Sequence, residues 1–311
     1  MSNKQGNIVV IGSVNMDLVA KTDRFPQPGE TIIGHQFYQI PGGKGANQAV
    51  AAARLGAEVS FIGCVGDDLF GQQLSKGLDN EGINLSGLRT VEGVSSGLAH
   101  ITLTDTDNTI IVIPGANAHC TPEHIAAHES LIAGADIVLM QLEIPLQTVQ
   151  YAVQLAERHG IPVILNPAPA HPLPNELLQG VTYLTPNETE LAFLAGGLAA
   201  STHSLQIQLQ VLLNQGVKHV VATQGERGVL FGSQDSSYIH HQPAHPVQAI
   251  DTTGAGDAFN AGLAVALAEG NSLSESVTFA SAVGALAVTK LGAQPGMPTR
   301  DEVMNFIKQK G

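Results

Sequence analysis

The stretch DTTGAGDAFNAGLA, residues 251–264, is the most informative part of this chain. It places small residues just before a helical pattern at Ala258–Glu269, so the backbone N–H groups of Gly254, Ala255 and Gly256 are unblocked where a helix begins. Because a helix N-terminus carries positive potential, these features together predict an anion hole for a phosphoryl group. The loop is not a Walker A loop, since no Lys-Ser or Lys-Thr pair follows its glycines.

Asp257 follows these glycines in the first turn of the predicted helix. An aspartate at this place is favoured by the helix dipole and is usually only a cap. The functional interpretation is a general base, which accepts a proton from an alcohol that attacks the γ-phosphoryl group of a nucleotide. The residues alone leave both interpretations open.

Outside this stretch, short β-rich apolar runs alternate with helical patterns. The patterns Ala46–Leu55, Leu146–His159 and Leu205–Gln215 each end near a glycine, as helix C-termini commonly do. Strands that alternate with helices predict an α/β fold, a largely parallel sheet with helices on both faces. The predicted strands are Asn7–Ser13, Glu58–Val65, Ile137–Leu142, Pro162–Leu165, Val181–Thr185, His219–Thr223 and Val229–Gly232.

Two segments, Thr31–Ile40 and Gly97–Ile113, look like strands with no helix between them. The second predicts a hairpin, with strands at Leu98–Leu103 and Thr109–Ile113 around a polar turn. Both segments point to a small second sheet above one edge of the first, which serves as a lid over a site, a dimer surface, or both.

The domain organisation follows from these segments. No linker or low-complexity tract separates the parts of the chain. We therefore expect a single domain over residues 1–311, with lid strands inserted from about 14–41 and 94–114.

Polar residues follow several of the predicted strands. In an open parallel sheet, ligands bind in the crevice beyond the carboxyl ends of the strands. Each of these residues alone is about as well explained as an ordinary turn former. Because five sets fall at the same end of the sheet, they predict a polar site there. The sets are Asn15 with Asp17, Glu143, Asn166, Asn187 with Glu188, and Gln224 to Glu226.

A second glycine-rich segment, PGGKGANQ at residues 41–48, also runs into an alanine-rich helical pattern. Its glycines let the backbone approach a ligand closely, Asn47 can hydrogen-bond hydroxyl groups, and Lys44 can meet a phosphate. Taken alone, the segment is better explained as a tight connection between a strand and a helix.

The bulk composition narrows the class of protein. Apolar residues make up 43% of the 311 residues and charged residues 13%, which is typical of a globular chain. The net charge of −13 argues against nucleic acid or an anionic membrane as a partner. We expect a cytoplasmic protein, because the chain shows no signal peptide, no membrane-spanning run, and only the unpaired Cys64 and Cys120.

Together these motifs resemble the ribokinase-like (pfkB) carbohydrate kinase family. Residues 251–264 look like its C-terminal signature, and GGKGANQAVAAARLG at residues 42–56 resembles its N-terminal signature. Further matches run in the family's order over nearly the whole chain, at residues 14–17, 140–143, 166–170, 185–190 and 292–295. The resemblance implies that fold and ATP-dependent phosphorylation of a sugar. The stretches GGKGANQ, NPAPA and TPNETE are most similar to members that phosphorylate the 5-hydroxyl of ribose.

The resemblance also implies roles for the matching residues. Asp257 would be the catalytic base, with Gly254, Ala255 and Gly256 forming the anion hole. The sugar would be held by Asn15, Met16, Asp17, Gly43, Lys44, Gly45, Ala46, Asn47 and Glu143. ATP would contact Asn187, Thr223, Gln224, Gly225, Glu226, Arg227, Gly228, Gly256 and Ser281.

Two cations and a homodimer are implied in the same way. Asn187 and Glu190 would organise Mg²⁺ through water, which fits the reluctance of magnesium to dehydrate. An activating monovalent cation such as K⁺ would lie beside the anion hole, and the lid sheet would pair two subunits. Gly296 stands where related sequences often carry a serine, so a side-chain ligand is missing there. The implied cation ligands are Asp251, Thr253, Ala287, Lys290, Gly292 and Gly296.

Other functions are weighed against this one. One or two pocket side chains can shift the acceptor to deoxyribose, fructose or a nucleoside. A non-catalytic sugar sensor on the same fold is a different class of answer, and the presence of Asp257 and its glycine loop argues against it. A dinucleotide oxidoreductase is disfavoured, because no G-x-G-x-x-G follows the first strand.

Three features are expected to have no catalytic role. His240, His241 and His245 match no recognised zinc spacing and are predicted to be surface structure. Arg300–Lys310 is predicted to be a peripheral packing helix, and Cys64 to be buried in a strand as an inert thiol.

Overall fold

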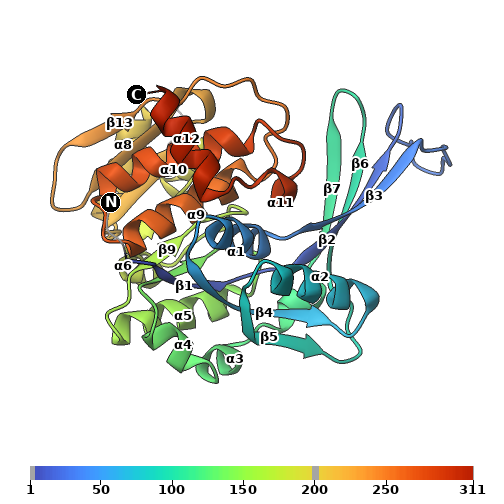
Figure 1. Ribbon diagram of the computed structural model, residues 1–311, viewed down its shortest axis with the longest axis horizontal. Helices are drawn as coiled ribbons and strands as arrows, with labels where there is room; N and C mark the ends of the chain where they lie inside the picture. The colour runs from blue at the N-terminus through green and yellow to red at the C-terminus, as the bar shows by residue number, and fades with distance from the viewer. Residues whose placement is uncertain (1–3, 198–202, 311) are drawn as a thin grey trace.

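The computed structural model describes residues 4–197 and 203–310, which form two β-sheets and the helices around them (Figure 1). The strand order of the main sheet is β13-β12-β11-β10-β9-β8-β1-β4-β5. Its first seven strands in chain order pair in parallel, and β12 and β13 add an antiparallel edge. This confirms the predicted α/β fold. The bounds are β1 Asn7–Ile11, β4 Glu58–Gly66, β5 Asn84–Val91, β8 Ile137–Met140, β9 Val163–Leu165, β10 Tyr183–Leu184, β11 His219–Thr223, β12 Val229–Ser233 and β13 Ile239–Gln242.

Helices cover both faces of the main sheet. Ile8 and Val10 of β1 belong to one hydrophobic core, and Val9 and Ile11 to another, because successive strand residues point to opposite faces. The first core is closed by α1 (Lys44–Arg54), α2 (Leu69–Asn80), α9 (Ala255–Ala268), α10 (Leu273–Ala287) and α12 (Arg300–Lys310). The second is closed by α3 (Pro122–Ala126), α4 (Glu129–Ala133), α5 (Leu146–Arg158), α6 (Asn175–Gly180), α7 (Glu188–Leu194) and α8 (Leu205–Asn214).

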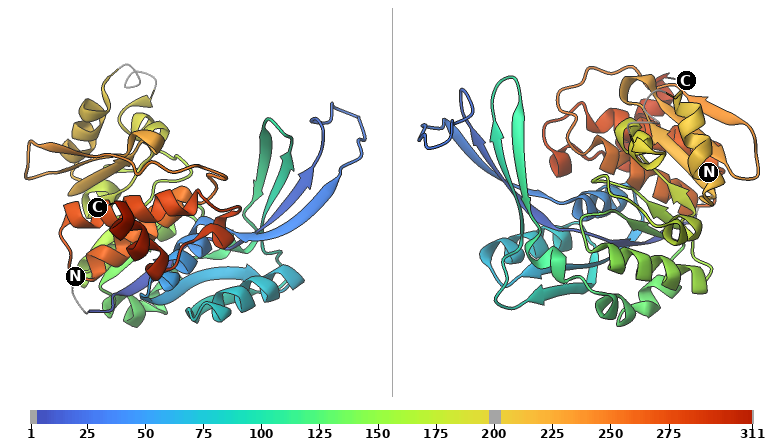
Figure 2. Two further views of the ribbon diagram at one scale, coloured as in Figure 1. Left: turned by 45° about the horizontal axis from the view of Figure 1, so that its top comes forward. Right: turned by 180° about the vertical axis from the view of Figure 1, so that it is seen from behind.

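The second sheet projects from the main body (Figures 1 and 2). Its strands lie in the order β3-β2-β6-β7, and β6 pairs with β7 as the predicted antiparallel hairpin. The strand predicted at Thr31–Ile40 is β3 at Gln36–Gly42 instead, because the seven residues of β2 pair only with that range. The other bounds are β2 Asn15–Lys21, β6 Gly97–Leu103 and β7 Asn108–Ile113.

Two strands of the main sheet, β5 and β13, escaped prediction. They read NLSGLRTV and IHHQ, and they are the two edges of the sheet. An edge strand has a neighbour on one side only and exposes more of its side chains, so its apolar pattern is weak. Within the described residues, no helix is long and apolar enough to cross a membrane.

The two glycine-rich segments place α1 and α9 side by side on one face of the sheet (Figure 1). Both helices begin after a glycine with positive φ, 88° at Gly43 and 78° at Gly254. A Cβ atom on Gly43 would lie 2.7 Å from the backbone nitrogen of Asn15. Glycine therefore lets α1 start against the chain where it leaves β1 and enters the second sheet.

Candidate active site

Asp257 lies in the first turn of α9 and is 6% exposed. Two amides of α1 hold its carboxylate: Asn47 Nδ2 donates to Oδ2 at 2.9 Å, and Gln48 Nε2 donates to Oδ1 at 3.0 Å. Burial raises the pKa of Asp257, while Lys44 and these two hydrogen bonds act in the opposite direction. The two glycine-rich segments of the sequence therefore meet at a single buried carboxylate.

The N-terminus of α9 has unused donors. The N–H of Ala255 donates to the carbonyl of Thr252 at 3.2 Å. Within the described residues, no oxygen accepts a hydrogen bond from the N–H of Gly256 or of Asp257. A Cβ atom on Gly256 would meet nothing within 4 Å, so this turn is open. Such a helix end can bind an anion.

A cavity of about 230 Å³ opens in front of Asp257. Burial opposes the charge of Lys44, but Asp257, Glu143 and Glu190 raise its pKa above the usual value. Burial also raises the pKa of Glu190, and the charge of Asp257 adds to this. The cavity thus joins acidic groups to a buried ammonium group. Its lining residues are Lys44, Asn166, Ala168, Thr185, Asn187, Glu190, Thr223, Thr252, Gly254, Gly256, Asp257 and Asn260.

Asn15, Asp17 and Glu143 lie where the two sheets meet. Asn117 Nδ2 donates to Asn15 Oδ1 at 2.7 Å, which leaves the Asn15 amide hydrogens for another partner. Burial and the charge of Glu143 raise the pKa of Asp17 to about 7. Glu143 Oε2 accepts from the Ser13 hydroxyl at 2.5 Å and from the Lys44 N–H at 3.1 Å.

Three of the predicted sugar residues shape the site through their backbone. The Met16 side chain is buried in the first hydrophobic core. The N–H of Ala46 donates to the Ser13 carbonyl at 2.9 Å, and the N–H of Gly45 donates to the Ser13 hydroxyl at 3.3 Å. These contacts fix the first turn of α1 against the chain that follows β1.

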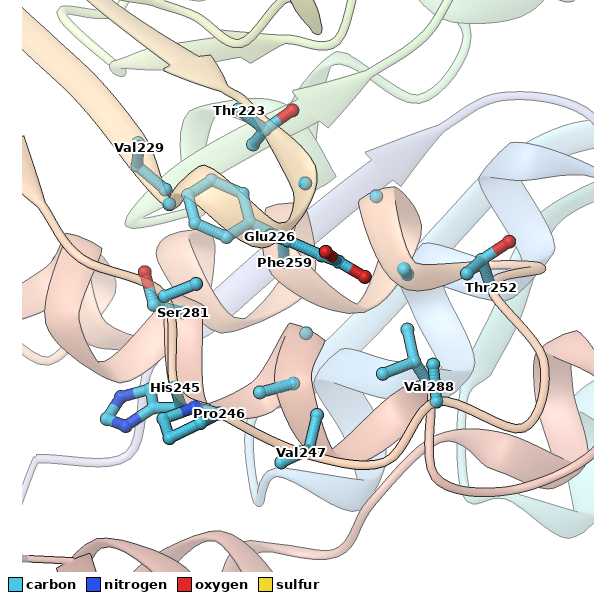
Figure 3. A pocket seen from close by; sticks show the side chains of 18 residues that line it. Thr223, Glu226, Val229, His245, Pro246, Val247, Thr252, Phe259, Ser281 and Val288 are labelled. Carbon is cyan, nitrogen blue, oxygen red and sulfur yellow. The ribbon is translucent and has the colours of Figure 1, made fainter.

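A second cavity, of about 590 Å³, lies beside the first and is largely walled by carbon (Figure 3). Thr223, Thr252 and Gly256 line both cavities, so the two are adjacent. Its lining residues are Thr223, Gly225, Glu226, Gly228, Val229, Ala244, His245, Pro246, Val247, Ala249, Thr252, Ala255, Gly256, Phe259, Ser281, Gly284, Ala285 and Val288.

Six of the nine predicted nucleotide residues belong to this lining. Asn187 lines the smaller cavity instead, and Gln224 and Arg227 line neither. Arg227 forms an ion pair with Glu188 and is exposed. His240 and His241 are exposed on the edge strand β13, in agreement with their predicted surface position, whereas His245 is only partly exposed and lines this cavity, which was not predicted. The His245 ring packs edge-on against the Phe306 ring.

Asn187 and Glu190 form a capping box at the start of α7. Asn187 Oδ1 accepts from the Glu190 N–H at 2.9 Å, and Glu190 Oε2 accepts from the Asn187 N–H at 2.8 Å. In the part of the chain that the structure describes, the other Glu190 oxygen, Oε1, accepts no hydrogen bond, so it is available to a ligand in the cavity that Glu190 lines. Within residues 4–197 and 203–310, no three His, Cys, Asp or Glu side chains cluster as a metal cage. The Glu190 carboxylate and the Asn187 amide line the cavity, and oxygen ligands of this kind suit a magnesium ion that keeps its waters and binds phosphates.

The loops at residues 251–254 and 287–296 lie together behind the start of α9. The Asp251 carboxylate joins them, because it accepts from the N–H of Thr253 at 2.9 Å and of Gly292 at 2.8 Å. A Cβ atom on Gly296 would lie 3.1 Å from the Ala287 carbonyl oxygen and 3.8 Å from that of Lys290. Two carbonyl oxygens therefore lie beside the position where a side chain is missing, and carbonyl oxygens are suitable ligands for a monovalent cation.

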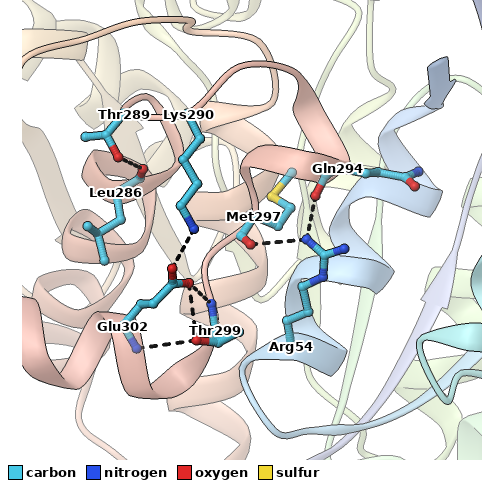
Figure 4. A network of polar contacts seen from close by, with 8 residues as sticks. All are labelled: Arg54, Leu286, Thr289, Lys290, Gln294, Met297, Thr299 and Glu302. Carbon is cyan, nitrogen blue, oxygen red and sulfur yellow. Dashed lines mark hydrogen bonds and ion pairs between the residues drawn. The ribbon is translucent and has the colours of Figure 1, made fainter.

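This second loop is tied to α1 and α12 (Figure 4). Arg54, at the end of α1, donates to the carbonyls of Gln294 at 2.6 Å and Met297 at 3.2 Å. Lys290 forms an ion pair with Glu302 at 2.7 Å. Gln294 lies in α11, Ala293–Gly296, whose position is therefore fixed from two sides.

Sequence reasoning missed several buried amides of the site. Gln48, Asn117 and Gln141 were absent from the predicted set. Gln48 donates to Asp257, Asn117 donates to Asn15, and Gln141 donates to Gln48. Asn260 donates to the Gly256 carbonyl at 2.8 Å and accepts from the Thr185 hydroxyl at 2.5 Å. The available signal was an amide inside an otherwise apolar run, as Gln141 is after β8.

Comparison with known proteins gives concordant matches. The pfkB family carbohydrate kinase model matches residues 5–300. A ribokinase of Bacillus subtilis is 44% identical, with 97% of this chain and 99% of the relative covered. A deoxyribokinase of Salmonella typhi is 35% identical, with 97% of this chain and 98% of the relative covered. An Arabidopsis thaliana ribokinase, solved with ribose and ATP, superposes with a TM-score of 0.92 at 36% identity, and 98% of this chain and 99% of that chain are covered.

Proposed function

The chain belongs to the pfkB family of carbohydrate kinases, and we propose that it transfers the γ-phosphoryl group of ATP to the 5-hydroxyl of ribose with Asp257 as general base. Phosphorylation of ribose by ATP is the activity of this chain, as its full-length likeness to ribokinases shows. The assignment of roles to individual residues is our proposal.

The observation that carries this assignment is the position of Asp257. Its carboxylate stands between the amides of α1 and the open N-terminus of α9. A sugar hydroxyl between Asp257 and the unused N–H groups would lose its proton to the carboxylate as its oxygen bonds to the γ-phosphorus. The bond from this phosphorus to the bridging oxygen would break, and ADP would leave. The N–H groups of Gly256 and of Asp257 itself would donate hydrogen bonds to the transferred group and stabilise its negative charge, whereas the N–H of Ala255, also predicted for this role, already donates to Thr252.

The sugar is held by groups that match its hydroxyls. We assign hydroxyl donors of ribose to the Asp17 and Glu143 carboxylates, and a hydroxyl oxygen to the free Asn15 amide hydrogens. The Lys44 ammonium lies among Asp257, Glu143 and Glu190, where it can neutralise charge on the transferred group. The sugar-binding side chains on one side and Lys44 on the other would together orient the 5-hydroxyl for attack on the γ-phosphorus.

ATP occupies the 590 Å³ cavity in this proposal, with its base against Phe259, Val288 and Ser281. Asn187 and Glu190 would hold Mg²⁺ through water, and a bound magnesium ion would neutralise charge on the phosphates. The carbonyls of Asp251, Thr253, Ala287, Lys290 and Gly292 would hold K⁺ beside the start of α9, and those of Ala287 and Lys290 lie near Gly296.

The test is ADP release with ATP and Mg²⁺ in potassium buffer, across ribose, 2-deoxyribose, fructose and adenosine. We expect a clear preference for ribose, because a site that pairs the 2-hydroxyl leaves a polar group unpaired with 2-deoxyribose. Preference for 2-deoxyribose would keep the mechanism and overturn the acceptor assignment. The similarity to a deoxyribokinase makes this the decisive comparison sugar. Absence of turnover on all four would favour the sugar sensor.

We also propose that the chain works as a cytoplasmic homodimer and that the second sheet is a lid inserted into a single domain. Every residue of β7 is exposed, including Ile110, Ile111 and Val112. An exposed apolar strand at a sheet edge is ordinarily covered. Ile111→Asp should lower the mass measured by light scattering from that of two chains to that of one. An unchanged mass would contradict pairing through the lid.

A further inference from the structure

Gln48 is a fully buried amide in the second turn of α1. Its Nε2 donates to Asp257 Oδ1 at 3.0 Å and to Asn166 Oδ1 at 3.3 Å. Its Oε1 accepts from Gln141 Nε2 at 2.5 Å, and Gln141 is also fully buried. Both amide hydrogens and the oxygen of this side chain are therefore hydrogen-bonded to protein groups.

This set of contacts allows a single orientation of the Gln48 amide. A reversed amide would turn Oε1 toward the oxygens of Asp257 and Asn166, and its NH₂ toward that of Gln141. Asn166 is fixed in turn, because its Nδ2 donates to the Thr185 carbonyl at 3.1 Å. A buried donor or acceptor without a partner costs about 1 to 3 kcal/mol, so the reversed state is disfavoured.

The neighbouring Asn47 differs in one respect. Its Nδ2 also donates to Asp257, at 2.9 Å, but within the described residues its Oδ1 has no hydrogen-bond partner. Asn47 therefore has an acceptor left for a sugar hydroxyl, whereas Gln48 has none. The two adjacent amides therefore differ in their available contacts. Asn47 can hydrogen-bond both the substrate and Asp257, whereas Gln48 hydrogen-bonds Asp257 and other protein groups only.

We propose that Gln48, oriented by Gln141, is a positioning residue that aims the Asp257 carboxylate at the acceptor hydroxyl and stabilises its ionised form. The proposal rests on the proposed function of Asp257 as the base. A hydrogen bond to a carboxylate favours its charged form. The hydrogen bond from Gln48 accordingly acts to lower the pKa of Asp257 against the effect of burial.

Three charged side chains besides Asp257 affect its ionisation, and they lie on α1, after β8 and on α7. The Lys44 ammonium on α1 favours the ionised carboxylate, and Glu143, which follows β8, opposes it. Glu190 on α7 also repels Asp257. Because these groups stay in place when Gln48 is replaced, a change in the titration of the reaction reports on the amide itself.

The experiment measures the single-turnover rate of phosphoryl transfer against pH, at saturating ribose and ATP, in Gln48→Met, Gln48→Glu and Gln141→Met. In Gln48→Met we expect a loss of about 10-fold or more at pH 7 and an acidic limb moved to higher pH. Gln48→Glu should move that limb further, because a second carboxylate repels Asp257. Gln141→Met should move it in the same direction by less.

Gln208→Met is the matched control, since Gln208 is a buried glutamine on α8 outside the site. It should leave the pH profile unchanged. Circular dichroism checks each fold, and if Gln48→Met does not fold, Gln141→Met decides. An unmoved acidic limb in the folded variants, with Asp257→Asn inactive, would overturn the positioning role alone. An active Asp257→Asn would overturn the proposed base instead.

Discussion

The helices α1 and α9 both begin at a glycine with positive φ beside the same buried carboxylate, yet their first turns differ. In α1 the N–H groups are occupied: that of Lys44 by Glu143, and those of Gly45 and Ala46 by Ser13. In α9 the N–H groups of Gly256 and Asp257 have no acceptor within the described residues. The two glycine patterns look alike in sequence. The two helix starts differ in whether their first N–H groups have hydrogen-bond acceptors within the protein.

This difference separates two tasks. A helix end whose donors are taken by protein oxygens is fixed and cannot also bind an anion, so α1 presents side chains to a sugar. A helix end with open donors keeps its positive potential for a charged group, so α9 suits the transferred phosphoryl group. The account predicts that changes near the start of α9 affect chemistry and that changes near the start of α1 affect sugar binding. The exceptions are side chains of α1 that act on Asp257, such as Gln48.

The largest effect should come from Asp257→Asn. An amide of the same shape cannot accept the proton, so the rate of transfer should fall on the order of 10²-fold or more. ATP affinity should remain, because the large cavity is untouched. Turnover and calorimetric ATP binding measure the two quantities. A rate close to that of the unchanged protein would remove Asp257 from the role of base.

Lys44→Met should have the next largest effect. It tests an exception to the assignment of sugar binding to α1 and phosphoryl transfer to α9. Lys44 begins α1, but its ammonium lies among Asp257, Glu143 and Glu190. We therefore expect kcat to fall on the order of 10-fold or more, and by a larger factor than the rise in KM for ribose. Lys76→Met on the exposed side of α2 is the control. A change in KM alone would assign Lys44 to sugar binding.

Replacing potassium by sodium should have a smaller effect, confined to the α9 side. The cation loops pack behind the start of α9, where Asp251 joins Thr253 to Gly292. We expect lower kcat with the dissociation constant for ribose unchanged. The thermal midpoint in each salt supplies a readout independent of activity, and potassium should raise it more than sodium. Indifference of both quantities to the swap would contradict the site.

Asp17 predicts a proton linkage confined to the α1 side. Its pKa is raised to about 7 by burial and by Glu143, so below pH 7 the free protein holds a proton there. Ribose hydroxyls donate best to the ionised carboxylate, so binding should release a proton and the affinity should weaken as pH falls below 7. Calorimetry at pH 6 in two buffers of different ionisation enthalpy measures the release. Equal heats in both buffers would contradict it.

The sequence was sufficient to predict the parallel sheet, the hairpin of the second sheet and both glycine-rich helix starts. These features depend on local signals, such as apolar runs and glycines that need positive φ. It was insufficient for Gln48 and Gln141, because a glutamine has the same appearance in sequence whether it faces water or a buried carboxylate. The place of His245 in the cavity lining was not predicted for the related reason that its surroundings depend on how the chain turns after β13.

The central claim is that the start of α1 serves sugar binding and the start of α9 serves phosphoryl transfer. The most direct test perturbs each start separately, with Gly43→Ala for α1, Gly254→Ala for α9 and Gly270→Ala as the control. All three glycines have positive φ, but a Cβ atom on Gly270 would meet nothing within 4 Å, so the control reports backbone strain alone. The measurement is the dissociation constant for ribose beside the single-turnover rate at saturating ribose. The account predicts weaker ribose binding in Gly43→Ala and slower transfer in Gly254→Ala. The same loss in both quantities for both variants would contradict the separation of the sugar end from the phosphoryl end.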